Sequence, residues 1–211
     1  MTTMKEIAEK TGVSVSTVSL VLNKRDVGRV KPDIAQRVRQ TATDLGYKPN
    51  PLARSLRTSK TRILGFISEE VATTPYAGGI ILGAQDAAST YGYMLITVST
   101  DGQASEESEI AALKRYGVDG FFYSKMSNRI ATVPKSLSDY PVVLVDATDA
   151  NNTLPSVEPD ECQIAYDATS RLIEAGCERI AYVGCSENMI AQDGRLAGYR
   201  AALEGTDHGF D

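Results

Sequence analysis

The apolar residues of this chain change their spacing near residue 60, and this change constrains the fold more than any other feature. Before that point they recur every three or four positions, which is the period of an amphipathic helix. Beyond it, short apolar runs of strand length alternate with helical patterns. The chain therefore predicts a small helical unit followed by a larger α/β unit, and its 211 residues are enough for both.

Two helices are expected at the start of the chain, separated by a glycine turn. Thr3 and Glu6 fit a capping box where the first helix begins, near Met4. Gly12 then allows a tight turn, and the apolar spacing of residues 15–23 predicts the second helix. Helix, turn and helix in this order are typical of a DNA-binding headpiece.

A third helix is expected from Pro32 until Gly46 ends it. Pro49 and Pro51 then interrupt the pattern. The basic, polar residues 52–62 predict a short and marginal fourth helix that leads into a linker, because so few residues cannot hold an isolated helix.

The rest of the chain alternates predicted strands and helices, which is the pattern of a parallel, doubly wound sheet. The expected strands are residues 63–68, 94–100, 120–124, 142–147 and 179–185. The expected helices are residues 76–91, 106–116, 161–175 and 192–204.

The net charge of −5 conceals a strong asymmetry. Residues 1–62 hold 13 Lys and Arg against 5 Asp and Glu, a net charge of +8, whereas the remainder holds 9 against 22, a net charge of −13. A basic head attracts phosphates, and an acidic body stays off the DNA duplex. A chance fluctuation of surface charge is the alternative explanation.

Several classes of protein are disfavoured. The three cysteines never form a C-x-x-C spacing, so no disulfide framework, zinc site or other cofactor is expected. The single histidine, His208, lies in a Gly-flanked polar tail, which leaves no plausible triad and argues against an enzyme. No apolar run is long enough to span a membrane, and the N-terminus lacks a secretory signal, so we expect a cytoplasmic, nucleoid-associated protein.

The second predicted helix carries the chemistry of a DNA-reading helix. Such a helix needs small polar groups near its N-terminus, where backbone N–H groups also point at phosphates. Ser14, Ser16, Thr17 and Ser19 supply these groups, and Thr3 and Asn23 are candidates for contacts with the DNA backbone. The alternative is that the serines only cap the helix and face water.

Two long segments and the α/β body carry a family resemblance. KEIAEKTGVSVSTVSLVLN at 5–23 and RVRQTATDLGYKPNPLARSLRTSKT at 37–61 resemble the headpiece of the lactose-repressor/galactose-repressor (LacI/GalR) family of bacterial regulators, whose pattern is V-S-x-x-T-V-S-x-V-L-N followed by L-G-Y-x-P-N-x-x-A-R-S-L. TPYAGGIILGAQDAASTYGY and GRLAGYRAAL in the body agree more weakly.

The resemblance implies a repressor that binds a pseudo-palindromic DNA operator as a homodimer, under the control of a small sugar or sugar phosphate. It divides the chain into a helix-turn-helix headpiece, a hinge helix with its linker, a first lobe of a periplasmic-binding-protein-like domain and an incomplete second lobe: residues 1–48, 49–61, 62–156 and 157–211. Family members usually continue past this point, so we expect the chain to be truncated at Asp211.

By the same resemblance, Val15 and Ser16 read base edges, since a valine can contact a thymine methyl group and a serine is a permissive hydrogen bonder. Many members carry an arginine at the position of Leu20, which can pair with guanine. Leucine cannot donate a hydrogen bond, so we expect a different base preference or a purely structural role there. Tyr47 joins the expected DNA-binding residues.

The hinge is expected to order only when two copies meet on DNA. The resemblance makes Leu56 the wedge that enters the minor groove at the operator centre, with Asn50, Ala53 and Arg54 close to the groove and the backbone. The alternative is that Leu56 packs as a core residue under the linker.

The effector is expected where strand ends face each other. Positions that match the family suggest Thr74, Tyr76, Asp146 and Arg195, and the forked guanidinium of Arg195 suits vicinal hydroxyls or a phosphate. Alternatively, Arg195 is a surface residue and Asp146 only a cap.

Two other classes of function stay open from the sequence. A sugar receptor of the periplasmic type shares the α/β body, but a basic headpiece without a signal peptide speaks against it. A doubly wound enzyme would use the strand-end carboxylates, yet the sequence holds no phosphate-binding glycine loop and no metal cluster.

Overall fold

The computed structural model of the chain describes residues 2–50, 55, 58–69, 75–100, 103–184 and 189–206. It divides into two compact units, Met1–Ser59 and Lys60–Asp211, and each is described here by itself. The predicted hinge residues Ala53, Arg54 and Leu56, and the predicted effector residue Thr74, lie outside the described residues. The lobe boundaries expected within the second unit stay a prediction.

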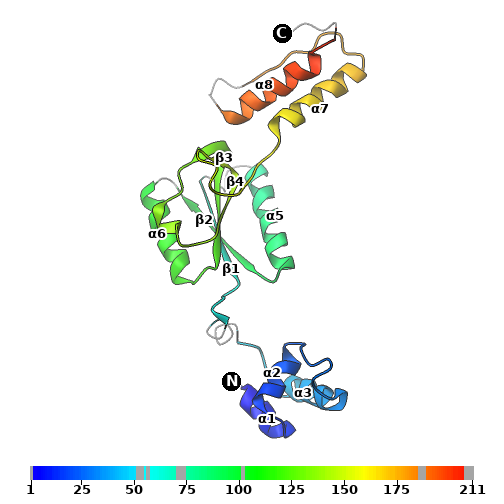
Figure 1. Cartoon of the computed structure of the whole chain (residues 1–211), viewed down its shortest axis with the longest axis vertical. Helices are drawn as coiled ribbons and strands as arrows, with labels where there is room; N and C mark the ends of the chain where they lie inside the picture. The colour runs from blue at the N-terminus through cyan, green and yellow to red at the C-terminus, as the bar shows by residue number, and fades with distance from the viewer. Residues whose placement is uncertain are drawn as a thin grey trace. The chain divides into compact units, whose positions relative to one another are not determined.

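The first unit consists of three helices, α1 (Met4–Thr11), α2 (Val15–Leu22) and α3 (Pro32–Asp44), as the sequence predicts (Figure 1). The capping box of Thr3 and Glu6 is present at the start of α1. Gly12 ends α1 with a φ of 70°, a left-handed conformation that glycine adopts without strain. The turn between α1 and α2 is therefore built into the sequence.

The three helices share one small core. Its buried members recur at helical spacing on the facing sides of the helices: Ile7, Ala8, Val18, Val21, Ala35, Val38 and Ala42. Removing these side chains from water supplies most of the stability of such a short bundle.

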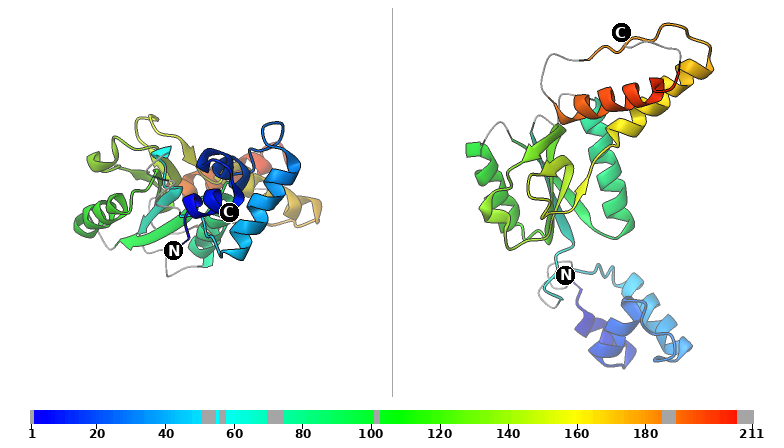
Figure 2. Two further views of the ribbon diagram at one scale, coloured as in Figure 1. Left: turned by 90° about the horizontal axis from the view of Figure 1, so that it is seen from below. Right: turned by 45° about the horizontal axis from the view of Figure 1, so that its top comes forward.

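The second unit contains a five-stranded parallel sheet in the order β2-β1-β3-β4-β5. Its strands are β1 (Ile63–Glu69), β2 (Met94–Thr100), β3 (Gly120–Ala131), β4 (Val142–Asp149) and β5 (Ser156–Val157). Helices α5 (Pro75–Thr90) and α6 (Gln103–Arg115) follow β1 and β2 and cover opposite faces of the sheet, so the fold is doubly wound, as predicted (Figures 1 and 2).

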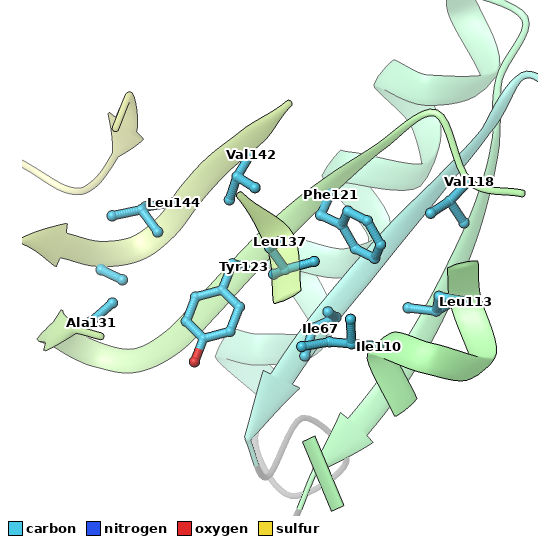
Figure 3. Packing of buried hydrophobic residues seen from close by; sticks show 11 residues of the cluster. Ile67, Ile110, Leu113, Val118, Phe121, Tyr123, Ala131, Leu137, Val142 and Leu144 are labelled. Carbon is cyan, nitrogen blue, oxygen red and sulfur yellow. The ribbon is translucent and has the colours of Figure 1, made fainter. Parts of the chain in front are cut away.

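Alternation along the strands sends one set of side chains to each face. On the α6 face, Ile67, Phe121 and Tyr123 pack with Ile110 and Leu113 of α6 in the main buried cluster (Figure 3). The 3-10 turn η1 (Lys135–Leu137) covers the same face in place of a helix between β3 and β4.

Two further helices, α7 (Glu161–Glu174) and α8 (Ile190–Leu203), lie side by side (Figures 1 and 2). Their backbones approach closely because α8 presents glycine at the contact. A Cβ atom added at Gly198 would overlap the carbonyl oxygen of Cys162 in α7.

Residues 179–185 were expected to form a strand, and this expectation is wrong for the described part, 179–184. A β-strand needs a neighbouring strand to satisfy its backbone N–H and C=O groups. No described strand pairs with this segment, and the side chain of Val183 is 92% exposed. Apolar content alone therefore did not decide its structure.

None of the described helices combines the length and the hydrophobicity that a membrane-spanning helix requires.

We predict that Gly198→Ala destabilises the pair of α7 and α8. Alanine normally stabilises a helix interior by about 0.5–1 kcal/mol relative to glycine, but here the added methyl group would overlap backbone atoms, at a cost of about 1–3 kcal/mol or more. Amide hydrogen exchange of α7 and α8 measures the loss.

The matched control is Gly83→Ala in α5, because no atom lies within 4 Å of the added Cβ there. This variant is expected to be neutral or more stable by up to about 1 kcal/mol. Equal protection of α7 in the Gly198 variant and the parent chain would contradict the close approach.

Candidate nucleic-acid interface and ligand site

The start of α2 is fixed by its own cap. The Ser14 hydroxyl accepts a hydrogen bond from the backbone N–H of Thr17 at 3.1 Å and also bonds the Thr17 hydroxyl at 2.9 Å. An N-cap of this kind is worth about 1 kcal/mol and sets the direction of the first turn. Ser14 and Thr17, both expected to face DNA, thus also hold the helix in place.

The first turn of α2 exposes Val15 and Ser16 to solvent. Val15 is 46% exposed, whereas Val18 and Val21 on the same helix are buried in the core. An apolar methyl group and a hydroxyl group therefore lie side by side at a helix N-terminus, where backbone N–H groups lack helical partners. This combination suits a surface that contacts both base edges and phosphates.

The other predicted headpiece residues have varied surroundings. Thr3 caps α1, and the Asn23 amide donates to the carbonyl oxygen of Ser19 at 2.7 Å. Leu20 and Tyr47 are half-buried, and Tyr47 packs against the headpiece core.

A basic loop follows α2, and sequence reasoning missed the residue that holds it. Asp26 is buried, and its carboxylate accepts a hydrogen bond from the guanidinium of Arg39 in α3. The Asp26 carbonyl oxygen also accepts from the N–H groups of Arg29 and Val30, at 2.9 Å each. These contacts fix the loop and leave its cations exposed to solvent: Lys24, Arg25, Arg29 and Lys31.

In the second unit, Asp146 lies in the carboxyl-terminal half of β4 and is only 3% exposed. Its φ is +51°, a left-handed conformation that is uncommon for residues other than glycine, although aspartate adopts it more readily than most. The register of β3 against β4 shifts nearby, between Ser124 and Arg129. Strain and a bulge at one place are typical of a functional site, where they direct a side chain.

Tyr76, at the start of α5, donates a hydrogen bond to the carboxylate of Asp146. Burial raises the pKa of Tyr76 above its ordinary value of 10.0, and the negative charges of Asp146 and Glu161 raise it further. The positive charge of Arg195 acts in the opposite direction. Three of the four predicted effector residues therefore share one electrostatic environment.

The guanidinium of Arg195 in α8 is already held by a carboxylate. Its Nε and Nη2 atoms donate to the two oxygens of Glu161 at 2.6 Å and 3.1 Å, and this hydrogen bonding raises the pKa of Arg195. Sequence reasoning missed Glu161, because an acidic residue in the first turn of a helix is ordinarily explained by the helix dipole.

A second charged cluster, also missed, joins the last residue of β1 to the middle of β3 and the first turns of α6. The ammonium group of Lys125 contacts the carboxylate of Glu69 and lies 3.5 Å from that of Glu106. The Tyr123 hydroxyl donates to Glu106 at 2.6 Å. Burial and this hydrogen bond raise the pKa of Tyr123 far above its ordinary range.

Among the described residues, no group of three or more His, Cys, Asp and Glu side chains could hold a metal ion. The strand order reverses between β1 and β3, and ligands of doubly wound folds bind at the carboxyl ends of the strands on either side of such a point. Tyr76 follows β1, and Asp146 lies one strand beyond β3.

Comparison with known proteins covers both units. Residues 3–50 match the sequence profile described as "Bacterial regulatory proteins, lacI family". Residues 61–211 match the profile described as "Periplasmic binding proteins and sugar binding domain of LacI family".

Among individual relatives, the HTH-type transcriptional regulator RegA of Clostridium saccharobutylicum is 36% identical over 206 residues. The match covers 96% of this chain and 61% of that protein, so the chain spans about three fifths of the length of this relative.

Two solved structures are also similar. A complex of the transcriptional regulator CelR with cellobiose is 27% identical, with a TM-score of 0.56, and the match covers 100% of this chain and 64% of that one. The lac repressor dimer bound to operator and the anti-inducer ONPF is 20% identical, with a TM-score of 0.69 over 96% of this chain and 61% of that one, which shows a common fold.

We predict that Asp26→Ala destabilises the headpiece by about 1–2 kcal/mol, because the loop loses a buried acceptor while Arg39 stays partly solvated. Amide hydrogen exchange of α2 and α3 measures the change. As a control, Glu174→Ala removes one side of the exposed Arg171–Glu174 pair and is expected to change stability by less than about 0.5 kcal/mol. Equal effects of the two variants would contradict a structural role of Asp26.

We also predict that Asp146→Asn lowers the pKa of Tyr76 but leaves it above 10.0, because burial is the largest cause of the shift and persists in the variant. NMR titration of the chain with labelled tyrosine follows the ionisation, and Tyr76→Phe identifies its signal. An unchanged pKa would show that Asp146 does not act on Tyr76.

Proposed function

Because the chain belongs to the LacI family of bacterial regulatory proteins, we propose that it is a sequence-specific DNA-binding repressor that binds a pseudo-palindromic operator as a homodimer. A small carbohydrate bound by the second unit controls this binding. The observation that carries the proposal is the exposed first turn of α2 with Val15 and Ser16, held by a cap and flanked by a basic loop.

In the proposed complex, the N-terminal turn of α2 enters the major groove. Val15 contacts a thymine methyl group and Ser16 bonds a base edge, while the caps and backbone N–H groups of the helix position it on phosphates. The net charge of +8 on residues 1–62 supports this orientation, because each neutralised phosphate releases counterions. Ser14, Thr17, Thr3 and Asn23 contribute at the backbone.

Further contacts come from the end of the headpiece and the hinge. We assign to this surface the residues that the family pattern matches: Tyr47, Asn50, Ala53, Arg54 and Leu56. Leu56 from each of two copies would form the minor-groove wedge, which requires a dimer and a two-fold symmetric site. The proposed headpiece and hinge are residues 1–48 and 49–61.

The effector is proposed to bind the first lobe, 62–156, together with the part of the second lobe in 157–211. Tyr76 and Asp146 line one pocket in which hydroxyl groups could be hydrogen-bonded, and the charge of Arg195 acts on Tyr76. Thr74 belongs to the same set by sequence. The sugar in the CelR complex supports a carbohydrate as the ligand class. Control requires that the sugar bind the DNA-bound and free forms with different affinity.

The direct test is selection of binding sites from random DNA by the whole chain, with and without a panel of sugars. The expected result is a two-fold symmetric consensus whose occupancy changes with at least one sugar. Enrichment without any two-fold symmetry would count against a dimeric repressor, and an occupancy that no sugar changes would count against carbohydrate control.

We predict that Leu20→Arg changes the preferred base at one position of each half-site. An arginine can donate two hydrogen bonds to guanine, and such a pair discriminates by about 1–3 kcal/mol. The control Gln36→Arg adds the same charge to the exposed surface of α3 and is expected to leave base preference unchanged. An identical consensus for the Leu20 variant and the parent chain would place Leu20 away from the bases.

A further inference from the structure

The cations described near the strand ends of the second unit are each paired with a carboxylate. Lys125 contacts Glu69 and lies close to Glu106, and its side chain is largely buried. Arg129 lies 3.9 Å from the other oxygen of Glu69. Positive charge at this place is therefore neutralised within the protein.

Arg195 is the residue that would best receive an anionic ligand, but the Nε–Nη2 side of its guanidinium is occupied and its charge is balanced by a carboxylate. Two of its donors bond the two oxygens of Glu161, whose side chain is only 9% exposed. A phosphate that took these donors would leave the Glu161 carboxylate with little solvent and without its cation, which is strongly unfavourable. The Arg195–Glu161 ion pair therefore has no net charge to attract an anionic ligand.

Negative charge, in contrast, is in excess around the ligand region. A pocket of about 490 Å³ is lined by Tyr76, Phe122 and Val145 together with the carboxylates of Asp146 and Glu158. No lysine or arginine is among the described residues that line this pocket.

These observations define the chemistry of a suitable ligand. Sugar hydroxyl groups donate to carboxylates, each of which has about four acceptor sites, and the C–H face of a sugar ring packs on apolar side chains. A phosphate monoester carries about −1.5 to −2 charges at neutral pH and would face this excess of carboxylates.

We propose that the effector is an uncharged sugar, and that the paired arrangement of Arg195 with Glu161 and of Lys125 with Glu69 selects against sugar phosphates. This inference rests on the sensor function proposed above and names its ligand class. The sequence leaves two ligand classes open, sugars and sugar phosphates, and this proposal selects the first.

The test is calorimetric titration of the whole chain at low salt with matched pairs: glucose, fructose and ribose, each against its phosphate monoester, and cellobiose. The expected result is saturable binding of at least one uncharged sugar. If that sugar is glucose, fructose or ribose, its own phosphate monoester should bind at least tenfold more weakly. If it is cellobiose, every phosphate monoester tested should bind at least tenfold more weakly. Glu161→Gln removes the carboxylate that pairs with Arg195. It is therefore expected to reduce the ratio of the sugar affinity to the monoester affinity by at least threefold.

The control Glu174→Gln removes one carboxylate from an exposed pair and is expected to leave the ratio unchanged. Circular dichroism establishes that both variants are folded, and the ratio in the parent chain tests the inference without any variant.

Two other results of the titration would have different consequences. Tighter binding of a phosphate monoester by the parent chain overturns this inference and leaves a carbohydrate-controlled regulator in place. Binding of neither sugars nor esters overturns the sensor function, and the inference with it.

Discussion

The parallel pairing of β1 with β2 on one side and β3 on the other determines where the rest of the second unit lies. Each parallel connection crosses a face of the sheet with a right-handed turn. The connection from β1 to β2 and the connection from β2 to β3 run in opposite directions along the sheet, so α5 and α6 cover opposite faces. The strand order then reverses next to β1, and the carboxyl ends of the strands form one edge. Tyr76 and Asp146 meet at this edge because the topology brings them there, although 69 residues separate them.

The two units differ in net charge as clearly as they differ in the spacing of their apolar residues. The head carries the cations that a DNA backbone attracts, and its buried Asp26 is used to fix a loop rather than to neutralise the surface. In the acidic body, the cations near the strand ends are matched by carboxylates. We propose that the exposed cations of the head bind the phosphates of DNA, whereas the paired cations of the body leave little positive charge for a phosphate ligand.

Periodicity predicted the elements whose stability is local or whose apolar faces are continuous: the headpiece helices with their caps, and β1 to β4. It missed the extension of β3 to Ala131, because the polar residues after Tyr123 show no alternation and are strand only beside β4. Periodicity also predicted a strand at 179–185, but apolar residues form a strand only beside a neighbouring strand, and no described strand pairs with this segment. The Glu161–Arg195 and Glu69–Lys125 pairs join residues 34 and 56 positions apart, so only the tertiary structure reveals them.

We propose that the headpiece recognises a particular DNA sequence through α2 and its basic surroundings. The most direct measurement compares the affinity of the chain for a two-fold symmetric operator and for a scrambled duplex over a range of salt concentrations. We expect both affinities to fall steeply as the salt concentration rises, while the operator stays strongly preferred. Equal affinity for the two duplexes, or an affinity that salt does not change, would contradict it.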